Sequence, residues 1–206
     1  MATTINDQLV SKTRSMFAAS IAVKQEVMES QVEIVVQMAE LISRSLQNGG
    51  KLLLCGNGGS AADAQHLAAE LLVRLRPQVD RDGIPALALA TDTSSLTACG
   101  NDYSFEVYYE RLVTTLGKPG DVLMGITTSG RSSNIVRALH AARAREMVTL
   151  GLLGSGGGDA LAECDLALVV PSDTTARIQE AHITIGHALM ELVEDLLFDS
   201  AFLASR

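Results

Sequence analysis

The sequence predicts an α/β fold: one three-layer domain with a five-stranded, mainly parallel sheet between helices. Two observations support this prediction. From residue 51 onward, short apolar runs alternate with helical patterns, and such alternation is typical of parallel sheets covered on both faces. Two of these runs also end in turns rich in glycine or hydroxyl groups. In parallel sheets, ligands bind at such turns, beyond the carboxyl ends of the strands.

The chain begins with two predicted helices, at residues 10–17 and 23–46, and Asn48-Gly49-Gly50 ends the second. The second helix is apolar on more than one side, which indicates packing between subunits. Without a Pro/Ser-rich linker, we expect a single domain over residues 1–206. Residues 1–48 would supply the leading helices, and residues 51–206 the sheet core with a C-terminal helix.

The remaining elements follow from the apolar pattern. Strands are predicted at residues 51–55, 85–90, 121–126, 148–153 and 166–170. Helices are predicted near residues 61–75, 93–99, 105–116 and 133–145, with a last helix at about 177–202.

Composition limits the possible functions. The 206 residues carry a net charge of −8, which argues against broad binding to nucleic acids or anionic membranes. No apolar run reaches the ~18 residues of a membrane span. The N-terminus does not resemble a signal peptide. The three cysteines are widely spaced and form no CxxC pair, so we expect a reduced, cytoplasmic setting.

The first of the two turns joins the run 52–55 to a helical pattern through Gly56-Asn57-Gly58-Gly59-Ser60. The first N–H groups of a helix lack intrahelical partners and lie at the positive end of its dipole, so they bind anions. Glycine lets a phosphate approach the backbone closely. Ser60 is expected to cap the helix or to bond a phosphate oxygen.

The second turn, Thr127-Thr128-Ser129-Gly130-Arg131-Ser132, has four hydroxyl side chains in six positions and also follows an apolar run. Alone, it also fits an ordinary hydroxyl-capped helix start. Two such turns in one small domain favour a phosphorylated ligand.

His66 and Glu70 are four residues apart and share one helix face, which fits a metal-binding or proton-transferring pair. An exposed surface pair is the alternative. Likewise, Gln179, His182 and His187 also fit polar positions of a long helix. Arg74 also fits a salt bridge to Glu70, and Asp102 a turn or capping residue.

Several ordered motifs resemble the sugar isomerase (SIS) family, and within it the phosphoheptose isomerases. The resemblance covers nearly the whole chain. The motifs are Cys55–Ser60 with Asp63, His66 and Glu70; Gly100-Asn101-Asp102; 120–123; 125–130; and 177–180 with His182 and His187.

This resemblance implies a homotetramer with active sites between subunits. It also implies conversion of sedoheptulose 7-phosphate to D-glycero-D-manno-heptose 7-phosphate, the first step toward bacterial surface heptose. In enzyme classes this is an intramolecular oxidoreductase, a phosphosugar isomerase. Glu70 would be the base and His187 its acid/base partner. The implied zinc ligands are His66, Glu70, Gln179 and His187.

The resemblance also implies a set of residues that hold the sugar phosphate: Asn57, Gly58, Gly59, Ser60, Glu70, Arg74, Asn101, Asp102, Thr127, Thr128, Ser129, Ser132 and Gln179. The chain departs from the family at Ala176, where some members have an aspartate. Thr127 and Arg131 replace a common serine and asparagine, and Thr127 keeps the hydroxyl.

The implied chemistry is consistent with these residue types. Moving a carbonyl between adjacent carbons requires a base that takes up and returns a proton, a group that stabilises the enediolate, and a group that relays the hydroxyl proton. Two other functions stay open: a tetrameric protein that binds the DnaA initiator, which the family also contains, and a sugar-phosphate sensor. Neither needs a base such as Glu70 beside a phosphate turn.

Overall fold

The computed structural model describes residues 4–198. Its five strands form one sheet in the order β2-β1-β3-β4-β5, and every neighbouring pair is parallel. The predicted parallel α/β fold is therefore confirmed. The strands are β1 (Leu52–Gly56), β2 (Ala86–Ala88), β3 (Val122–Thr127), β4 (Val148–Leu153) and β5 (Leu166–Val169).

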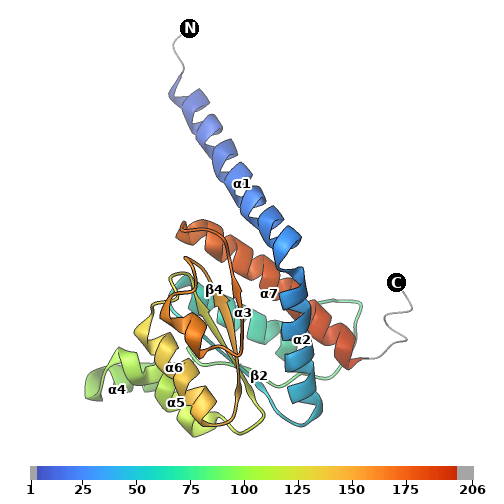
Figure 1. The fold of residues 1–206 in the computed structure, drawn as a ribbon, viewed down its shortest axis with the longest axis vertical. Helices are drawn as coiled ribbons and strands as arrows, with labels where there is room; N and C mark the ends of the chain where they lie inside the picture. Colours follow the sequence, from blue (N-terminus) through green and yellow to red (C-terminus); the bar gives the residue numbers. More distant parts are fainter. Residues whose placement is uncertain (1–3, 199–206) are drawn as a thin grey trace.

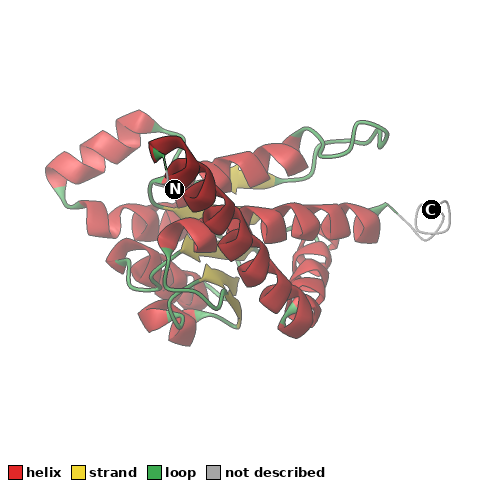
Figure 2. Cartoon of the chain, turned by 90° about the horizontal axis from the view of Figure 1, so that it is seen from above, coloured by secondary structure: helices red, strands yellow, loops and turns green. Residues whose placement is uncertain are grey.

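Two apolar cores lie on opposite faces of the sheet, because successive strand side chains point to opposite faces. In β1, Leu52 and Leu54 belong to one core, whereas Leu53 and Cys55 belong to the other. The strands accordingly lie between two helical layers (Figure 2). The first core is covered by α2 (Val32–Gln47), α3 (Gly59–Leu72) and α7 (Thr175–Leu197), and the second by α4 (Thr93–Asp102), α5 (Tyr108–Leu116) and α6 (Ser133–Ala144).

Several predicted boundaries need correction. The helix predicted at 105–116 begins as a 3₁₀ turn, Phe105–Val107, before α5, and a second 3₁₀ segment, Gly158–Glu163, precedes β5. Of the last predicted helix, residues 199–202 lie outside the described part of the chain. Ser60 does not cap α3. The N-cap is Gly58, whose φ of 54° suits glycine, and Ser60 lies buried inside the helix.

The leading helices also differ from the prediction. The structure has α1 (Ile5–Ser30) and α2, with a break at Gln31, where one helix was predicted over 23–46. The side chain of Gln31 explains the break. Its Nε2 donates to the Val169 carbonyl oxygen (2.9 Å), and its Oε1 accepts from the Val169 N–H (3.2 Å). Gln31 thus pairs with the exposed edge of β5, while α1 projects from the body of the molecule (Figure 1).

No helix within residues 4–198 combines the length and the apolar character that crossing a membrane requires.

His182 fastens α7 to the sheet. Its Nε2 donates to the Leu153 carbonyl oxygen at the end of β4 (3.0 Å), and Nδ1 is buried with no partner in the described part of the chain. Burial lowers the pKa of His182 to about 4. The folded protein therefore holds this ring neutral at pH values where an unfolded chain protonates it.

We predict that His182 makes folding acid-sensitive. As the pH falls from 6.5 to 4, His182 becomes protonated in the unfolded state but stays neutral in the folded state. The free energy of unfolding therefore decreases across this pH range. The expected loss is about 3 kcal/mol, from the 1.36 kcal/mol that each pKa unit represents. Denaturant titrations at several pH values should show a flatter pH dependence for His182→Gln than for the parent. Equal slopes would contradict the prediction.

Candidate active site

The two glycine/hydroxyl turns meet at the carboxyl edge of the sheet. β1 ends at Gly56 and leads into α3, and the neighbouring strand β3 ends at Thr127 and leads into α6. Asn57 and Asn134 join the turns, because each side-chain amide donates to the oxygen of the other (2.9 and 2.8 Å). The buried Tyr109 hydroxyl donates to the Gly56 carbonyl oxygen from the other core. The turns therefore form one connected unit.

The hydroxyl side chains of the second turn differ in solvent exposure. Thr127 is buried, Thr128 and Ser132 are half-buried, and Ser129 is exposed. The Oγ atoms of Thr127 and Ser132 are 3.2 Å apart, and Ser129 Oγ accepts from the Arg131 N–H (3.2 Å). These contacts order the hydroxyl groups of the turn that precedes α6.

Gly130 allows this turn to pack closely against the loop after β4. It has a φ of 64°, and a Cβ atom there would lie 1.9 Å from the Gly157 carbonyl oxygen. Any side chain would therefore collide with backbone, so the loop after β4 fixes the shape of the hydroxyl turn.

Two histidines and a glutamate gather between α3 and α7. His66 Nε2 lies 2.7 Å from His187 Nε2 and 3.3 Å from Glu70 Oε1. Ligand atoms of all three residues lie within 4.8 Å of one another. The side chain of His66 is 47% exposed and that of Glu70 17%, so the pair lies at the surface with the glutamate largely covered. Imidazole nitrogens and a carboxylate oxygen are ligands that zinc accepts.

Asp63 adds negative charge to this cluster. It lies one turn ahead of His66 on α3, and its Oδ2 is buried without a hydrogen-bond partner in the described structure. Burial raises the pKa of Asp63, while the nearby rings of His66 and His187 act in the opposite direction. An unpartnered carboxylate oxygen beside two histidines fits a site that holds a cation. The sequence contained Asp63 in its motif but gave no signal of this role.

Gln179 extends from α7 toward the beginning of α3. A Cβ atom on Gly59 would be 2.7 Å from Gln179 Nε2, so the amide borders the first turn. His187 follows eight residues later on α7, about 12 Å along an ideal helix. The structure thus brings Gln179 to the turn at residues 56–60, and its role as a metal ligand stays a prediction.

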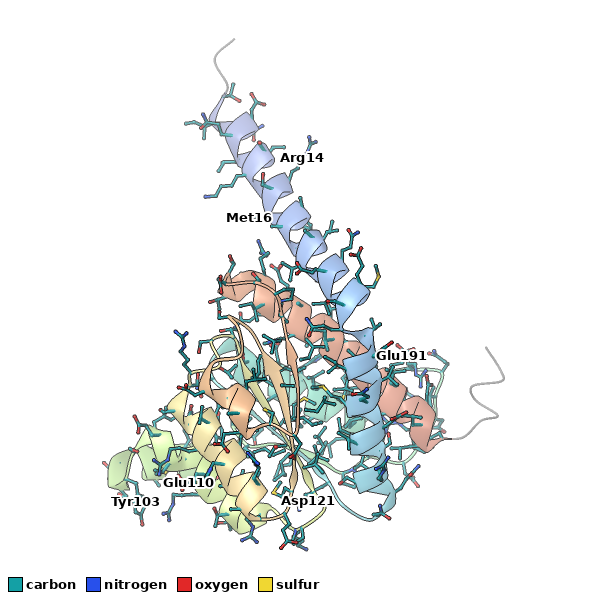
Figure 3. The ribbon with its side chains drawn as sticks, in the orientation of Figure 1. Arg14, Met16, Tyr103, Glu110, Asp121 and Glu191 are labelled. Atoms are coloured by element: carbon teal, nitrogen blue, oxygen red, sulfur yellow. The ribbon has the colours of Figure 1, made fainter. Side chains whose placement is uncertain are left out.

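Three other predicted residues lie apart from these groups. Arg74 follows the end of α3 and is exposed, and within residues 4–198 it forms no salt bridge with Glu70. Asn101 and Asp102 end α4, where Asn101 Nδ2 donates to Asp102 Oδ1 (2.8 Å) and both are exposed. The next residue, Tyr103, lies at the outer edge of the molecule (Figure 3). One chain alone therefore does not bring these residues to the turns.

Comparison with known proteins identifies the family. The SIS domain pattern matches residues 16–154. The phosphoheptose isomerase of Roseiflexus sp. (strain RS-1) is 52% identical over 181 residues, which cover 88% of this chain and 91% of the relative.

Solved structures agree with this result. The phosphoheptose isomerase of Neisseria gonorrhoeae is 46% identical with a TM-score of 0.85, covering 90% of this chain and 98% of that one. The enzyme of Francisella tularensis is 38% identical with a TM-score of 0.85, covering 89% and 97%. The chain belongs to the phosphoheptose isomerase family of SIS-domain proteins.

Proposed function

We propose that this chain interconverts sedoheptulose 7-phosphate and D-glycero-D-manno-heptose 7-phosphate through an enediolate, in the cytoplasm, for bacterial surface heptose synthesis. One carbon is oxidised while its neighbour is reduced within the same molecule. The enzyme is therefore an isomerase that needs no external electron acceptor, rather than an oxidoreductase in the ordinary sense. The observation that carries the proposal is the grouping of Glu70 and His66, on the helix that begins at the first turn, with His187 on α7.

The joined turns would bind the phosphate. The N–H groups at the start of α3 and the hydroxyls of Thr127, Thr128, Ser129 and Ser132 supply donors without a large cationic surface. Phosphate binding far from the reacting carbons would fix the opened sugar in reactive geometry. We assign the same ligand to the other predicted positions: Asn57, Gly58, Gly59, Ser60, Arg74, Asn101, Asp102 and Gln179.

Glu70 would carry the proton between the two carbons, and His187 would relay the hydroxyl proton, since imidazole titrates near neutral pH. Zinc, held by His66, Glu70, Gln179 and His187, would supply a Lewis acid for the developing negative charge on oxygen. The donor set and the unpartnered oxygen of Asp63 support a cation at this place.

Two observations favour the enzymatic function over a DnaA-binding protein or a sugar-phosphate sensor. Neither alternative uses a partly buried glutamate held against two histidines. Family membership and this grouping point in the same direction.

A homotetramer would complete the sites. Six apolar side chains along α1 are between 46% and 77% exposed: Ile5, Leu9, Met16, Phe17, Ile21 and Met28. An apolar groove of about 420 Å³ is lined by residues of α1, α2 and α7, among them Val27, Val32, Val36, Ile185 and Leu192. Exposed apolar surface of this extent is typical of subunit interfaces. Neighbouring chains would also bring further side chains to the turns.

The first prediction from this proposal separates chemistry from binding. Glu70→Gln keeps the size of the side chain but cannot take the proton, so turnover should fall by ~10²–10⁴-fold while sugar-phosphate affinity survives. Ser129→Ala should instead weaken binding before any large loss of turnover. Both quantities are measured with sedoheptulose 7-phosphate, by calorimetry and by assay of the aldose. Parental turnover in Glu70→Gln would exclude Glu70 as the base.

The second prediction concerns the metal. Dialysed protein should bind zinc, and His66→Ala should weaken zinc affinity by more than about tenfold, since even outer-shell changes cost that much. Affinity is measured by calorimetry and metal content by mass spectrometry. His140→Ala is the matched control, because His140 is an exposed histidine on α6 paired with Glu163. Equal zinc binding by both variants would reject the proposed site.

The third prediction concerns assembly. Light scattering at micromolar concentration should give the mass of a tetramer for the parent, and Phe17→Glu should shift the protein to smaller species, because it places charge on the apolar side of α1. Lys12→Glu, on the same helix but already polar, should leave the mass unchanged. A parent protein that is monomeric under these conditions would overturn the tetramer.

A further inference from the structure

The last turn of α3 is held by an arginine from outside the helix. Glu70 belongs to this turn, because α3 ends at Leu72, and the final carbonyl groups of a helix lack intrahelical partners. Arg81 provides hydrogen-bond donors for two of these carbonyl groups. Its Nη2 donates to the Glu70 carbonyl oxygen and its Nη1 to the Leu71 carbonyl oxygen, each at 2.9 Å. A cation at this end also complements the helix dipole.

Arg81 is itself fixed by α7. Its Nε donates to Glu194 Oε1 at 2.6 Å, and both side chains are only 1% exposed. The second oxygen of Glu194 accepts from Arg76 Nε at 2.6 Å, and Arg76 Nη2 donates to Asp195 Oδ1 at 2.7 Å. The surrounding charges therefore determine the position of the Arg81 guanidinium.

Glu194 lies on the same face of α7 as His187, seven residues or two turns later. Figure 3 labels Glu191, which lies about one turn before Glu194 on α7. A continuous path thus runs from the backbone of Glu70 through Arg81 and Glu194 into the helix that carries His187.

We infer that Arg81 is a positioning residue for the isomerisation: it sets the last turn of α3 so that the Glu70 carboxylate meets His66 and His187. The inference rests on the proposed role of Glu70 as base. The contacts concerned are short, 3.3 Å from Glu70 Oε1 to His66 Nε2 and 2.7 Å between the two histidines. A frayed last turn would move the base and leave the phosphate turn, at the opposite end of α3, in place.

Arg81→Lys tests this role. Lysine keeps the positive charge beside Glu194, but it lacks the planar fork that reaches Glu194 and two carbonyl oxygens together. We expect kcat to fall by about tenfold or more, because a displacement of ~1 Å can cost 10²-fold. KM should stay within about twofold, since the phosphate turn is unchanged. Amide hydrogen exchange in the last turn of α3 should become faster.

Asp121→Asn is the matched control for a general loss of stability. Asp121 is buried at the amino ends of the strands, directly before β3, and it pairs there with Lys51 (Figure 3). This variant should lower the thermal midpoint and leave both kcat and exchange in α3 at parental values. A folded Arg81→Lys protein with parental kcat and parental exchange would overturn the inference.

Two further outcomes are decisive. If Arg81→Lys does not fold, Glu194→Gln, which keeps an oxygen acceptor, replaces it, and parental kcat in that variant overturns the inference. If the parent protein lacks isomerase activity, the proposed function fails. The amide hydrogen-exchange comparison then tests on its own whether Arg81 orders the last turn of α3. Unchanged exchange in Arg81→Lys would show that it does not.

Discussion

The site depends on the close, parallel packing of α3 against α7. Gly186 makes this packing possible, because a Cβ atom there would lie 2.7 Å from Leu67 Cδ1. Leu67 directly follows His66, and His187 directly follows Gly186, so the contact between the helices also sets the contact between the imidazoles. Residues 121 positions apart in the chain thereby reach hydrogen-bonding distance. A larger side chain at Gly186 would force the helices, and with them the two rings, apart.

Local patterns were enough to predict much of this fold. Each strand is a short apolar run, and the two turns carry glycine or hydroxyl residues directly after β1 and β3. The parallel sheet with helices on both faces follows from that alternation. The family resemblance, carried by motifs such as 55–60, added the reaction and the grouping of His66 and Glu70 with His187.

The features that sequence analysis missed are set by contacts between distant residues. The break at Gln31 depends on a pairing with Val169, 138 positions away, and no local helix signal marks it. The apolar pattern continued past Leu72, but α3 ends there and Arg81 binds its last carbonyls. Ser60 looked like a cap because of its residue type. The positive φ of Gly58 moved the start of the helix one residue ahead of it.

The break at Gln31 has a mechanical consequence. Within the described chain, Val27 is the one buried residue of α1, and residues 5–19 extend beyond the side-chain contact of Ser20 with Glu180 on α7. At 1.5 Å per residue, its 26 residues span about 39 Å. A rotation of about 10° at Gln31 would therefore move the tip by roughly 7 Å on that length. The amide pairing of Gln31 with β5 lies at the base of this long helix. A small change in the angle of α1 there therefore produces a large displacement of its N-terminal end.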